Sequence, residues 1–449
     1  MSTKSGRSSV VRDRNDSVIG AAMRRRGVEL DLVLALLLCL PFIFLFTRLP
    51  PPELVPECLS RVVVAHWAHF VHVCDSYTMT QAMVELPRYF LEPNWWRGRP
   101  VYIVGGEAIA TVLRPAALLI RSFLIDGRIG GDVAADLFVA RFPQYFALMI
   151  VNFAVLGATI SLAMRLIDPC EQVLAAALGT AIATCDLVHG LFWTQHSNFL
   201  NVIVPLGCIT YFVAGCRARQ MTQASIAAFG LAAGVGTLAY AYIIIWLPMF
   251  VFGALYRDLR MAAAPVDIIR GLIQILIPLA SAGCGCVLAW WAINNLFLQG
   301  AISYEADVMR QFVWLADAWH DGRLGAALAE HWNGYPGQVW SWLGWPAPVS
   351  LAAIALLAWL GRRDWPPGQM LTDPILLAVA VTIVTMLIFN FLQGYYQPRL
   401  VNGLTLALFV ALARTAQKAK RARLGAAILI AITGAQIVDA FLEPAISLT

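Results

Sequence analysis

Asp75 lies between the first two long apolar runs of the sequence, and it is the acidic side chain there that is best placed to accept a proton. It follows three histidines and precedes Ser76 and Tyr77. A carboxylate held just above a bilayer, in partly apolar surroundings, has a raised tendency to accept a proton, as a general base for a hydroxyl group must. The same spacing fits a helix over 77–86 with Asp75 or Ser76 as its N-cap. These residues alone leave both roles open.

The three histidines of this segment, His66, His69 and His72, stand three residues apart. On a helix they would share one face, with a drift of about 60° by the third. Such a face could bind a metal ion, but no carboxylate lies between the histidines and there is no His-Glu-x-x-His pattern. We therefore expect an amphipathic helix at the membrane surface with histidine at its polar edge, and no metal cofactor.

Tryptophan is concentrated in the segment 297–345, which holds six of the 15 in the chain. Trp332 and Tyr335 lie there beside the turn-forming residues Gly334 and Pro336. Aromatic belts at a membrane surface explain this enrichment. The alternative is a lid that stacks on sugar rings, because flat aromatic faces match the C–H groups of a pyranose.

Membrane helices must position these side chains, because the composition excludes a water-soluble protein. The 449 residues are 59% hydrophobic and 13% charged, and the mean hydropathy is +0.69. Soluble domains are typically about 45–50% apolar and about 25% charged. Disordered, fibrous and disulfide-scaffold proteins are excluded as well. We expect an all-α fold, a transmembrane helical bundle that forms a single membrane domain over residues 1–449.

Positive charge indicates on which side of the membrane each loop lies. Residues 1–26 carry seven Lys or Arg against two Asp, so this tail accounts for the net charge of +5. A basic tail of this kind is cytoplasmic by the positive-inside rule. Lysine occurs only three times beside many arginines, which suggests a GC-rich bacterial genome. The prediction is a multi-pass protein of the bacterial inner membrane.

Apolar runs long enough for membrane helices recur along the whole chain. They cover residues 29–47, 101–124, 138–164, 171–194, 199–215, 223–256, 271–296, 346–361, 374–392, 400–413 and 424–441. The run 223–256 is too long for one span, and we expect a helix pair with an outer turn near residues 240–242. The run 101–124 contains Glu107 and Arg114, which are costly inside a bilayer. We expect that run to lie in the outer interface.

With this assignment the basic loops all fall on the cytoplasmic side. The prediction is about 11 spans, with the N-terminus inside and the C-terminus outside. Two long loops, 49–137 and 297–345, then lie outside and carry interfacial helices. The remaining outer turns are short, and they include 195–198 and 393–399.

Several short motifs in this layout resemble those of the GT-C superfamily of membrane glycosyltransferases, which take a sugar from a polyprenyl-phosphate carrier. Members place an acidic residue and a tyrosine in the first outer loop, as in Asp75-Ser76-Tyr77. Many continue with an Arg-Pro-Leu-Tyr-like motif that opens an interfacial helix, as in Arg99-Pro100-Val101-Tyr102. Arg141 and Arg165 resemble the basic residues that bound the second span. A late Tyr-x-x-Pro element is similar to Tyr395-Tyr396-Gln397-Pro398-Arg399.

The resemblance implies an inverting transfer to an acceptor hydroxyl on the periplasmic face, with Asp75 as the general base. The guanidinium of arginine offers parallel N–H donors that suit phosphate oxygens, so Arg399 is the first candidate to bind the phosphate of the sugar donor. Alternatively, Arg399 anchors the end of a helix at the membrane interface. The other candidates are Arg141, Arg99 and Tyr396 for the phosphate, and Tyr77, His196, Asn198, Arg97, Tyr102, Trp332 and Tyr335 for the sugar or acceptor. The implied partners are the lipid-linked sugar, a glycan, lipid or protein acceptor, and the bilayer; nucleic acid is not expected.

The sequence departs from the family pattern in two places. Some relatives have an Asp-x-Asp or Glu-x-Asp pair in the first loop, whereas Asp75 stands without such a partner, which favours a metal-independent enzyme without a cofactor. Many relatives also have an acidic residue between the third and fourth spans. Here that turn reads Gln195-His196-Ser197-Asn198.

Two other classes of function stay open. A ligase or polymerase of lipid-linked polysaccharides would use basic residues of the second long loop, where Arg310 and Arg323 stand. A transporter or assembly subunit would need polar groups facing each other at the midplane, and Asp186, His189 and Asn390 are the set available for that role.

Overall fold

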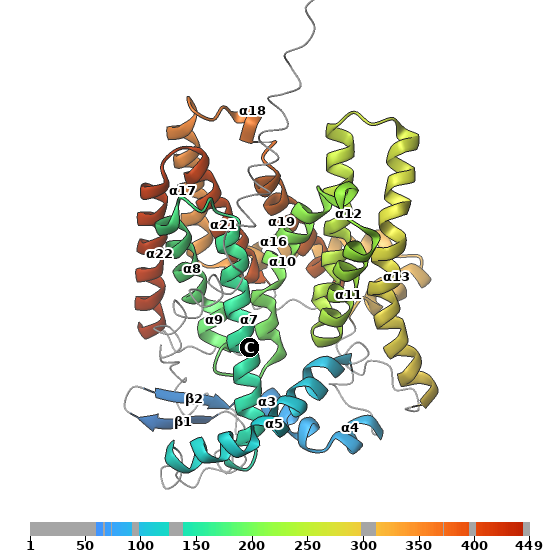
Figure 1. The fold of residues 1–449 in the computed structure, drawn as a ribbon, viewed down its shortest axis with the longest axis vertical. Coiled ribbons are helices and arrows are strands. Elements are labelled where there is room, and N and C mark those ends of the chain that lie inside the picture. The colour runs from blue at the N-terminus through green and yellow to red at the C-terminus, as the bar shows by residue number, and fades with distance from the viewer. Residues whose placement is uncertain are drawn as a thin grey trace, which may run out of the picture.

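The computed structural model describes residues 60–65, 68–72, 74–91, 98–124, 138–297, 311–370, 372–394 and 401–442. Helices make up most of these residues, and one β-hairpin precedes them (Figure 1). The α-helices are α3 (Cys74–Val84), α4 (Leu86–Leu91), α5 (Pro100–Leu124), α7 (Phe142–Arg165), α8 (Gln172–Ala183), α9 (Asp186–Leu191), α10 (Val204–Gly215), α11 (Gln223–Ala239), α12 (Trp246–Arg260), α13 (Pro265–Phe297), α15 (Val313–His320), α16 (Leu324–Leu343), α17 (Pro346–Gly361), α18 (Pro367–Met370), α19 (Pro374–Gln393), α21 (Gly403–Lys418) and α22 (Ala422–Leu442). Short 3-10 helices are η3 (Ser197–Val202), η4 (Ala218–Gln220) and η5 (Ala241–Ile245).

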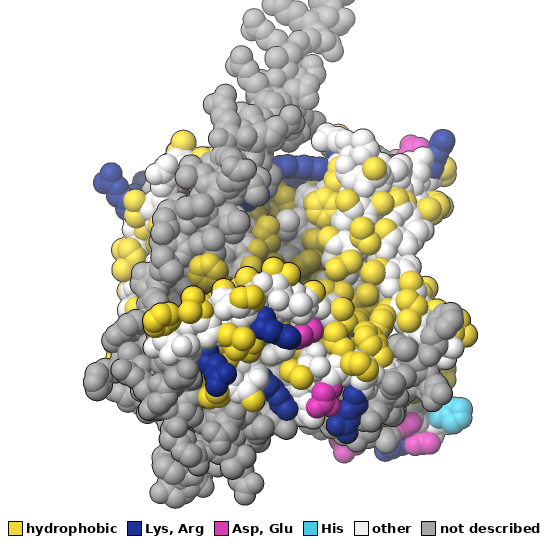
Figure 2. Space-filling view, turned by 60° about the horizontal axis from the view of Figure 1, so that its bottom comes forward, with side chains coloured by type: hydrophobic (Ala, Val, Ile, Leu, Met, Phe, Trp, Pro, Cys, Tyr) yellow, Lys and Arg dark blue, Asp and Glu magenta, His cyan; other side chains and the backbone are white. Residues whose placement is uncertain are grey.

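Within the described residues, seven helical stretches are long and apolar enough to cross a bilayer. They are formed by α5, α7, η3 with α10, η5 with α12, α13, α19 and α22, and the pair α16–α17, bent by 82°, would add an eighth. On the face shown in Figure 2, hydrophobic side chains cover the right-hand wall, and charged side chains lie at the upper rim and on the lower end turned towards the viewer. The architecture is that of a helical membrane protein. The count of about 11 spans and the orientation stay predictions, and the first expected span, 29–47, lies outside the described residues.

The apolar runs in the described part of the chain all contain helices, and two of the runs are broken. As predicted, the run 223–256 is interrupted after α11, where Tyr240 has an extended backbone (φ −154°, ψ 110°). The run 171–194 was expected to form one span, but it divides into α8 and α9. The break follows Thr184, whose hydroxyl lies 3.0 Å from Oε1 of Gln436 in α22 and 3.0 Å from the carbonyl oxygen of Thr180. Threonine can compete for helical backbone groups in this way.

The histidine-rich segment is not a helix, so that expectation was wrong. Strands β1 (Ser60–Ala65) and β2 (Ala68–His72) pair antiparallel, with Val63 opposite His69 and Ser60 opposite His72. Neighbouring residues on a strand point to opposite faces, so spacing by three does not place the histidines together. Several β-branched valines flank these histidines, and such residues favour a strand over a helix. The third histidine of the pattern, His66, lies outside the described residues.

Helix α5 is long and apolar enough to span a membrane, but it crosses the end of the bundle, whereas α7, α12 and α13 run along it (Figure 1). Its carboxylate Glu107 accepts hydrogen bonds from Arg114 (3.1 Å) and from Gln144 of α7 (3.0 Å). Gly106 lies at this crossing, where a Cβ would come within 2.9 Å of the end of the Leu148 side chain. The far side of α5 exposes apolar side chains, with Val112 and Phe123 each 79% exposed. This placement suits a helix lying along a membrane surface.

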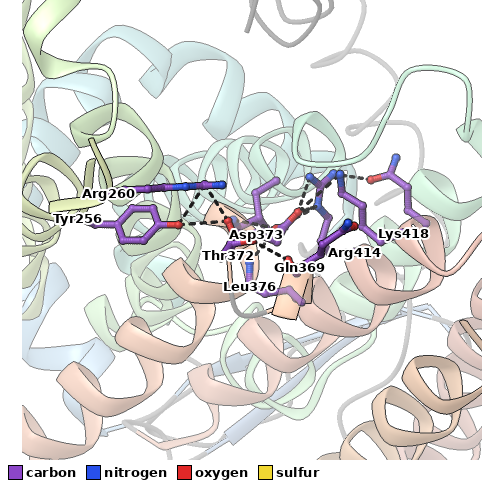
Figure 3. Close-up of polar contacts among 10 residues, drawn as sticks. Tyr256, Arg260, Gln369, Thr372, Asp373, Leu376, Arg414 and Lys418 are labelled. Atoms are coloured by element: carbon purple, nitrogen blue, oxygen red, sulfur yellow. Dashed lines mark hydrogen bonds and ion pairs between the residues drawn. The ribbon is translucent and has the colours of Figure 1, made fainter. Parts of the chain in front are cut away.

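The basic loops that follow α10, α12 and α21 meet at the opposite end of the bundle. Arg219 pairs with Asp258 at 2.6 Å and also donates to the carbonyl oxygen of Asp267 at 2.9 Å. Tyr256 Oη and Arg260 both donate to the carbonyl oxygen of Thr372, each at 3.1 Å (Figure 3). Loops that the charge pattern assigned to one side of the membrane therefore lie at one end of the molecule.

Asp373 links the start of α19 to α21 at this same end (Figure 3). Its carboxylate caps α19 by accepting the N–H groups of Ile375 and Leu376 at 3.0 and 3.2 Å. Arg414 donates to the carboxylate at 2.8 Å, and the side chains of both partners are almost fully buried. Lys418 lies farther away, at 3.7 Å. Arg414 is therefore the main cation that balances the buried charge.

Changing Asp373 to asparagine is expected to destabilise the fold by about 3 kcal/mol, because the buried Arg414 would lose its counter-charge while the cap is kept. Thermal unfolding of the detergent-solubilised protein measures this loss. Asp321→Asn is the control, because Asp321 pairs with Arg323 at 3.3 Å on the exposed surface, where such pairs contribute little. Equal shifts in the two variants would contradict the assignment.

Candidate functional site

Five consecutive polar residues are buried where α9 leads into η3, at the end of the bundle that α5 crosses. These are Thr194, Gln195, His196, Ser197 and Asn198, each no more than 6% exposed, and we call them the polar strip. Burying polar side chains is costly unless they are hydrogen-bonded, so a run of this kind requires partners. Some of the partners lie within or next to the strip, and others come from segments distant in the sequence.

Arg99 and Tyr102, from the start of α5, both contact the polar strip. The guanidinium of Arg99, a residue only 7% exposed, donates to the hydroxyl of Ser197. Tyr102 Oη donates to the carbonyl oxygen of Gln195 at 2.9 Å. Arg99 Cζ also lies 5.9 Å from the ring centroid of Tyr240, in the break between α11 and α12. The predicted first outer loop, the 195–198 turn and the 240–242 turn therefore meet at one place.

Side chains of α5 and α7 bind four successive backbone carbonyls, two just before the strip and two at its start. Asn152 Nδ2 donates to the carbonyl oxygens of Phe192 (3.0 Å) and Thr194 (2.8 Å). Tyr145 Oη donates to the carbonyl oxygen of Trp193, and Tyr102 binds that of Gln195. We call Tyr102, Tyr145 and Asn152 the carbonyl clamp. The sequence reasoning missed Tyr145 and Asn152; seven residues apart in the run 138–164, they share a helix face, which is the signal that could have found them.

His196 is held by two contacts with the backbone. Its Nδ1 accepts the N–H of Asn198 at 3.0 Å, and its own N–H donates to Thr194 Oγ1 at 3.3 Å. A ring nitrogen that accepts a hydrogen bond carries no proton, so the neutral ring has its proton on Nε2. His196 is therefore suited to donate a hydrogen bond through Nε2.

The start of α21 reaches the same region. Asn201, fully buried in η3, lies so close to Gly403 that a Cβ there would be 3.3 Å from Asn201 Nδ2. The end of α19 is fixed by Phe312, whose N–H donates to the carbonyl oxygen of Gln393 at 3.2 Å. Tyr396 and Arg399, predicted between these two helices, lie outside the described residues.

The other candidates from the first loop lie on or beside elements that contact the site. Asp75 and Tyr77 are in the first turn of α3, which packs against α5 and α7. Asp75 thus lies within the helix and not at its N-cap. Arg141 directly precedes α7 and is half-buried, and its carbonyl oxygen accepts the N–H of Tyr145 at 3.0 Å. Arg97 lies outside the described residues.

The two aromatic candidates of α16 lie against the end of α19. Tyr335 is buried, and its Oη donates to the carbonyl oxygen of Leu387 at 2.7 Å. Trp332 is 57% exposed and meets the ring of Phe391 edge-on, with 5.7 Å between centroids. Tyr335 therefore attaches α16 to α19, and the described contacts do not bring either residue to the polar strip.

Across the residues that the structure describes, no group of three or more His, Cys, Asp or Glu is placed to hold a metal ion. Comparisons with protein-family models, curated proteins and solved structures give no match. The geometry of the site thus consists of a buried guanidinium, a histidine ring and several hydroxyl and amide groups. These groups converge at one end of a membrane helix bundle.

Proposed function

We propose that the protein is a membrane glycosyltransferase of GT-C type, which moves a sugar from a polyprenyl-phosphate carrier to an acceptor hydroxyl on the periplasmic face of a bacterial inner membrane. The contact of Arg99 and Tyr102 with the polar strip carries this proposal. These residues belong to the motif that resembles the family, and they meet the 195–198 turn where family members have an acidic residue. A buried cation beside hydroxyl and amide groups suits a sugar phosphate.

In the proposed reaction Asp75 takes the proton of the acceptor hydroxyl, and the acceptor oxygen attacks the anomeric carbon of the sugar. The bond between that carbon and the phosphate oxygen breaks, and its electron pair leaves with the polyprenyl phosphate. The configuration at the anomeric carbon inverts. The leaving phosphate needs cations more than it needs an acid, and Arg99 offers a fork of N–H donors for that role, with Arg399 and Arg141 as further candidates. Helix α3, which carries Asp75, contacts α5, which begins directly after Arg99. This contact supports Asp75 as the base and Arg99 as the phosphate ligand of one site.

A transfer assay in a lipid extract of the producing organism tests the proposal. The purified protein is added, and each polyprenyl-phosphate sugar is followed by mass spectrometry. We expect one carrier to lose its sugar while free polyprenyl phosphate accumulates. Flux of an ion or substrate into proteoliposomes, without consumption of any carrier, would instead support a transporter.

Changing Arg99 to glutamine is expected to lower the rate of this transfer about a hundredfold, as loss of one charge-stabilising donor does in other enzymes. Arg99→Lys should recover part of the rate, because it keeps the charge but lacks the planar fork. Arg323→Gln is the control, because Arg323 is a largely exposed arginine paired with Asp321. A wild-type rate in Arg99→Gln would exclude Arg99 from the site.

A further inference from the structure

A group of arginines lies at the end of the bundle opposite the polar strip, where α10 and α12 end side by side. The two helices pack closely there, because a Cβ at Gly215 or at Gly253 would overlap a backbone carbonyl of the other helix. Arg257 is in the last turn of α12, four residues after Gly253, so it lies on the helix face that meets α10. Arg217 follows α10, and its N–H donates to the carbonyl oxygen of Ala214 at 2.8 Å. Both helix ends therefore bring an arginine to their junction.

Three guanidinium groups lie close to one thiol at this junction. Arg257, Arg217 and Arg260 all act electrostatically on the thiol of Cys216, and Arg257 acts most strongly. We call these three arginines the arginine seam. Like charges held this close repel one another, so an anion bound between them would be stabilised.

Arg257 has a donor that no described residue satisfies. Its Nη1 is buried and makes no hydrogen bond within the described part of the chain. The adjacent carboxylate of Asp258 is bound by Arg219 instead, at 2.6 Å. Cations are favoured at the C-terminal ends of helices, which explains why arginines occur here but provides no acceptor for this nitrogen. A buried donor without an acceptor is costly, and more so on a charged group, so Arg257 Nη1 indicates a ligand with acceptor oxygens.

The surroundings of the arginine seam indicate that this ligand comes from the membrane. Apolar side chains are exposed at the same end of α12, where Leu259 is 61% and Met261 70% exposed. Helix α12 belongs to a stretch long enough to cross a bilayer, so we expect its end to lie near the lipid headgroups. Basic pockets between membrane helices on the cytoplasmic side are typical sites for the headgroups of anionic lipids. A phosphate joined to acyl chains would match both the arginines and the apolar side chains.

We propose that the arginine seam binds the phosphate of an anionic phospholipid, with Arg257 as its central ligand. The guanidinium of Arg257 offers parallel N–H donors to phosphate oxygens. Arg217 and Arg260 add positive charge, and Arg260 is held in place by the carbonyl oxygen of Thr372 at 3.1 Å (Figure 3). The site lies at the other end of the bundle from the polar strip, so it does not depend on the proposed function. A free phosphate ion shares the recognised chemistry and is the other possible source of the anion.

Native mass spectrometry of the full-length protein in neutral detergent tests the proposal. It compares binding of phosphatidylglycerol with binding of diacylglycerol, which has the same acyl chains and no phosphate. We expect the wild type to prefer phosphatidylglycerol at least about tenfold, because a hydrogen bond to a charged group contributes about tenfold or more. Arg257→Gln should lose most of this preference, and Arg257→Lys should keep part of it, since lysine keeps the charge but lacks the planar fork.

Arg423→Gln is the matched control, because Arg423 is an exposed arginine at the start of α22, at the same end of the bundle. It should keep the wild-type preference. Arg217→Gln is a second test variant, with an expected loss of about fivefold for one charge near the membrane surface, and it replaces Arg257→Gln if that variant does not fold. Thermal unfolding without added lipid identifies variants that are misfolded.

Inorganic phosphate distinguishes the two sources of the anion. Phosphatidylglycerol that stays bound in millimolar phosphate supports the lipid as the ligand. Its displacement would assign the site to the free anion and overturn the lipid.

Three further results would overturn the proposal. The first is a wild type that binds the two lipids equally tightly. The second is an equal loss of preference in Arg257→Gln and Arg423→Gln, which would indicate diffuse surface charge. The third is an Arg257→Gln variant that binds both lipids more weakly by the same factor, as a purely structural role of this arginine would cause.

Discussion

Replacing Asp75 with asparagine is expected to lower the rate of sugar transfer roughly a thousandfold, within the range that general bases contribute. Asparagine has nearly the same shape as aspartate, but its amide cannot accept the proton of the acceptor hydroxyl. Asp75 lies in the first turn of α3, where asparagine is tolerated, so the fold should survive. The initial rate of carrier loss, followed by mass spectrometry in the lipid extract, measures the effect.

Asp168→Asn is the control for this variant. Asp168 is exposed in the turn after α7, where its Oδ1 accepts the N–H of Cys170 at 3.0 Å, and it should be replaceable without loss of rate. Treatment with EDTA is expected to leave the wild-type rate unchanged, because Asp75 is not part of an Asp-x-Asp or Glu-x-Asp pair. If Asp75→Asn transfers sugar at the wild-type rate, Asp75 is not the base.

The second large effect is expected on folding, from the change of Gly215 to alanine. Gly215 ends α10 and faces α12, and a Cβ there would overlap the carbonyl oxygen of Phe250. The contact is reciprocal, because a Cβ at Gly253 of α12 would overlap the carbonyl oxygen of Phe212 in α10. A backbone carbonyl cannot rotate away as a side chain can, so the two helices would have to separate. We expect a loss of about 3 kcal/mol, at the upper end of typical overpacking.

Whether Gly215→Ala lowers or raises the free energy of unfolding distinguishes an effect of close packing from an effect of helix propensity. Alanine is favoured over glycine in a helix by about 1 kcal/mol, so the variant would stabilise a helix that had room. Gly285→Ala in α13 is the matched control, since nothing lies within 4 Å of a Cβ at that position. Size-exclusion chromatography and thermal unfolding in detergent measure the folded fraction. Similar behaviour of the two variants would show that α10 and α12 can separate at little cost.

Hydropathy predicted where the helices lie, because a membrane helix needs a long apolar stretch whatever its neighbours are. The break at Tyr240 was also predictable, since the run 223–256 exceeds the thickness of a bilayer. The break after Thr184 was not, because the contact of its hydroxyl with Gln436 joins segments 252 residues apart in the chain. The β-hairpin was missed because spacing by three suggested a helix face, and the β-branched valines beside the histidines were given too little weight.

The candidate site was predicted in part. Motif reasoning selected Arg99, Tyr102, His196 and Asn198, and the structure brings Arg99 and Tyr102 into contact with the strip that contains the other two. Tyr145 and Asn152 share a helix face, which a local pattern reveals, but their targets are backbone carbonyls more than 35 residues away, which it does not. Asp75 and Arg399 stay predictions, because the side chain of the first and the whole of the second lie outside the described structure.

The positions of the clamp residues along the chain determine when they are synthesised relative to the carbonyls that they bind. Tyr102, Tyr145 and Asn152 all precede the carbonyls that they bind. During synthesis from the N-terminus, the donors therefore leave the ribosome before residues 192–195 enter the membrane. A polar segment between two apolar helices would otherwise be costly in lipid, where unsatisfied backbone groups find no water. The acceptors of the strip therefore enter the membrane after the donors that bind them.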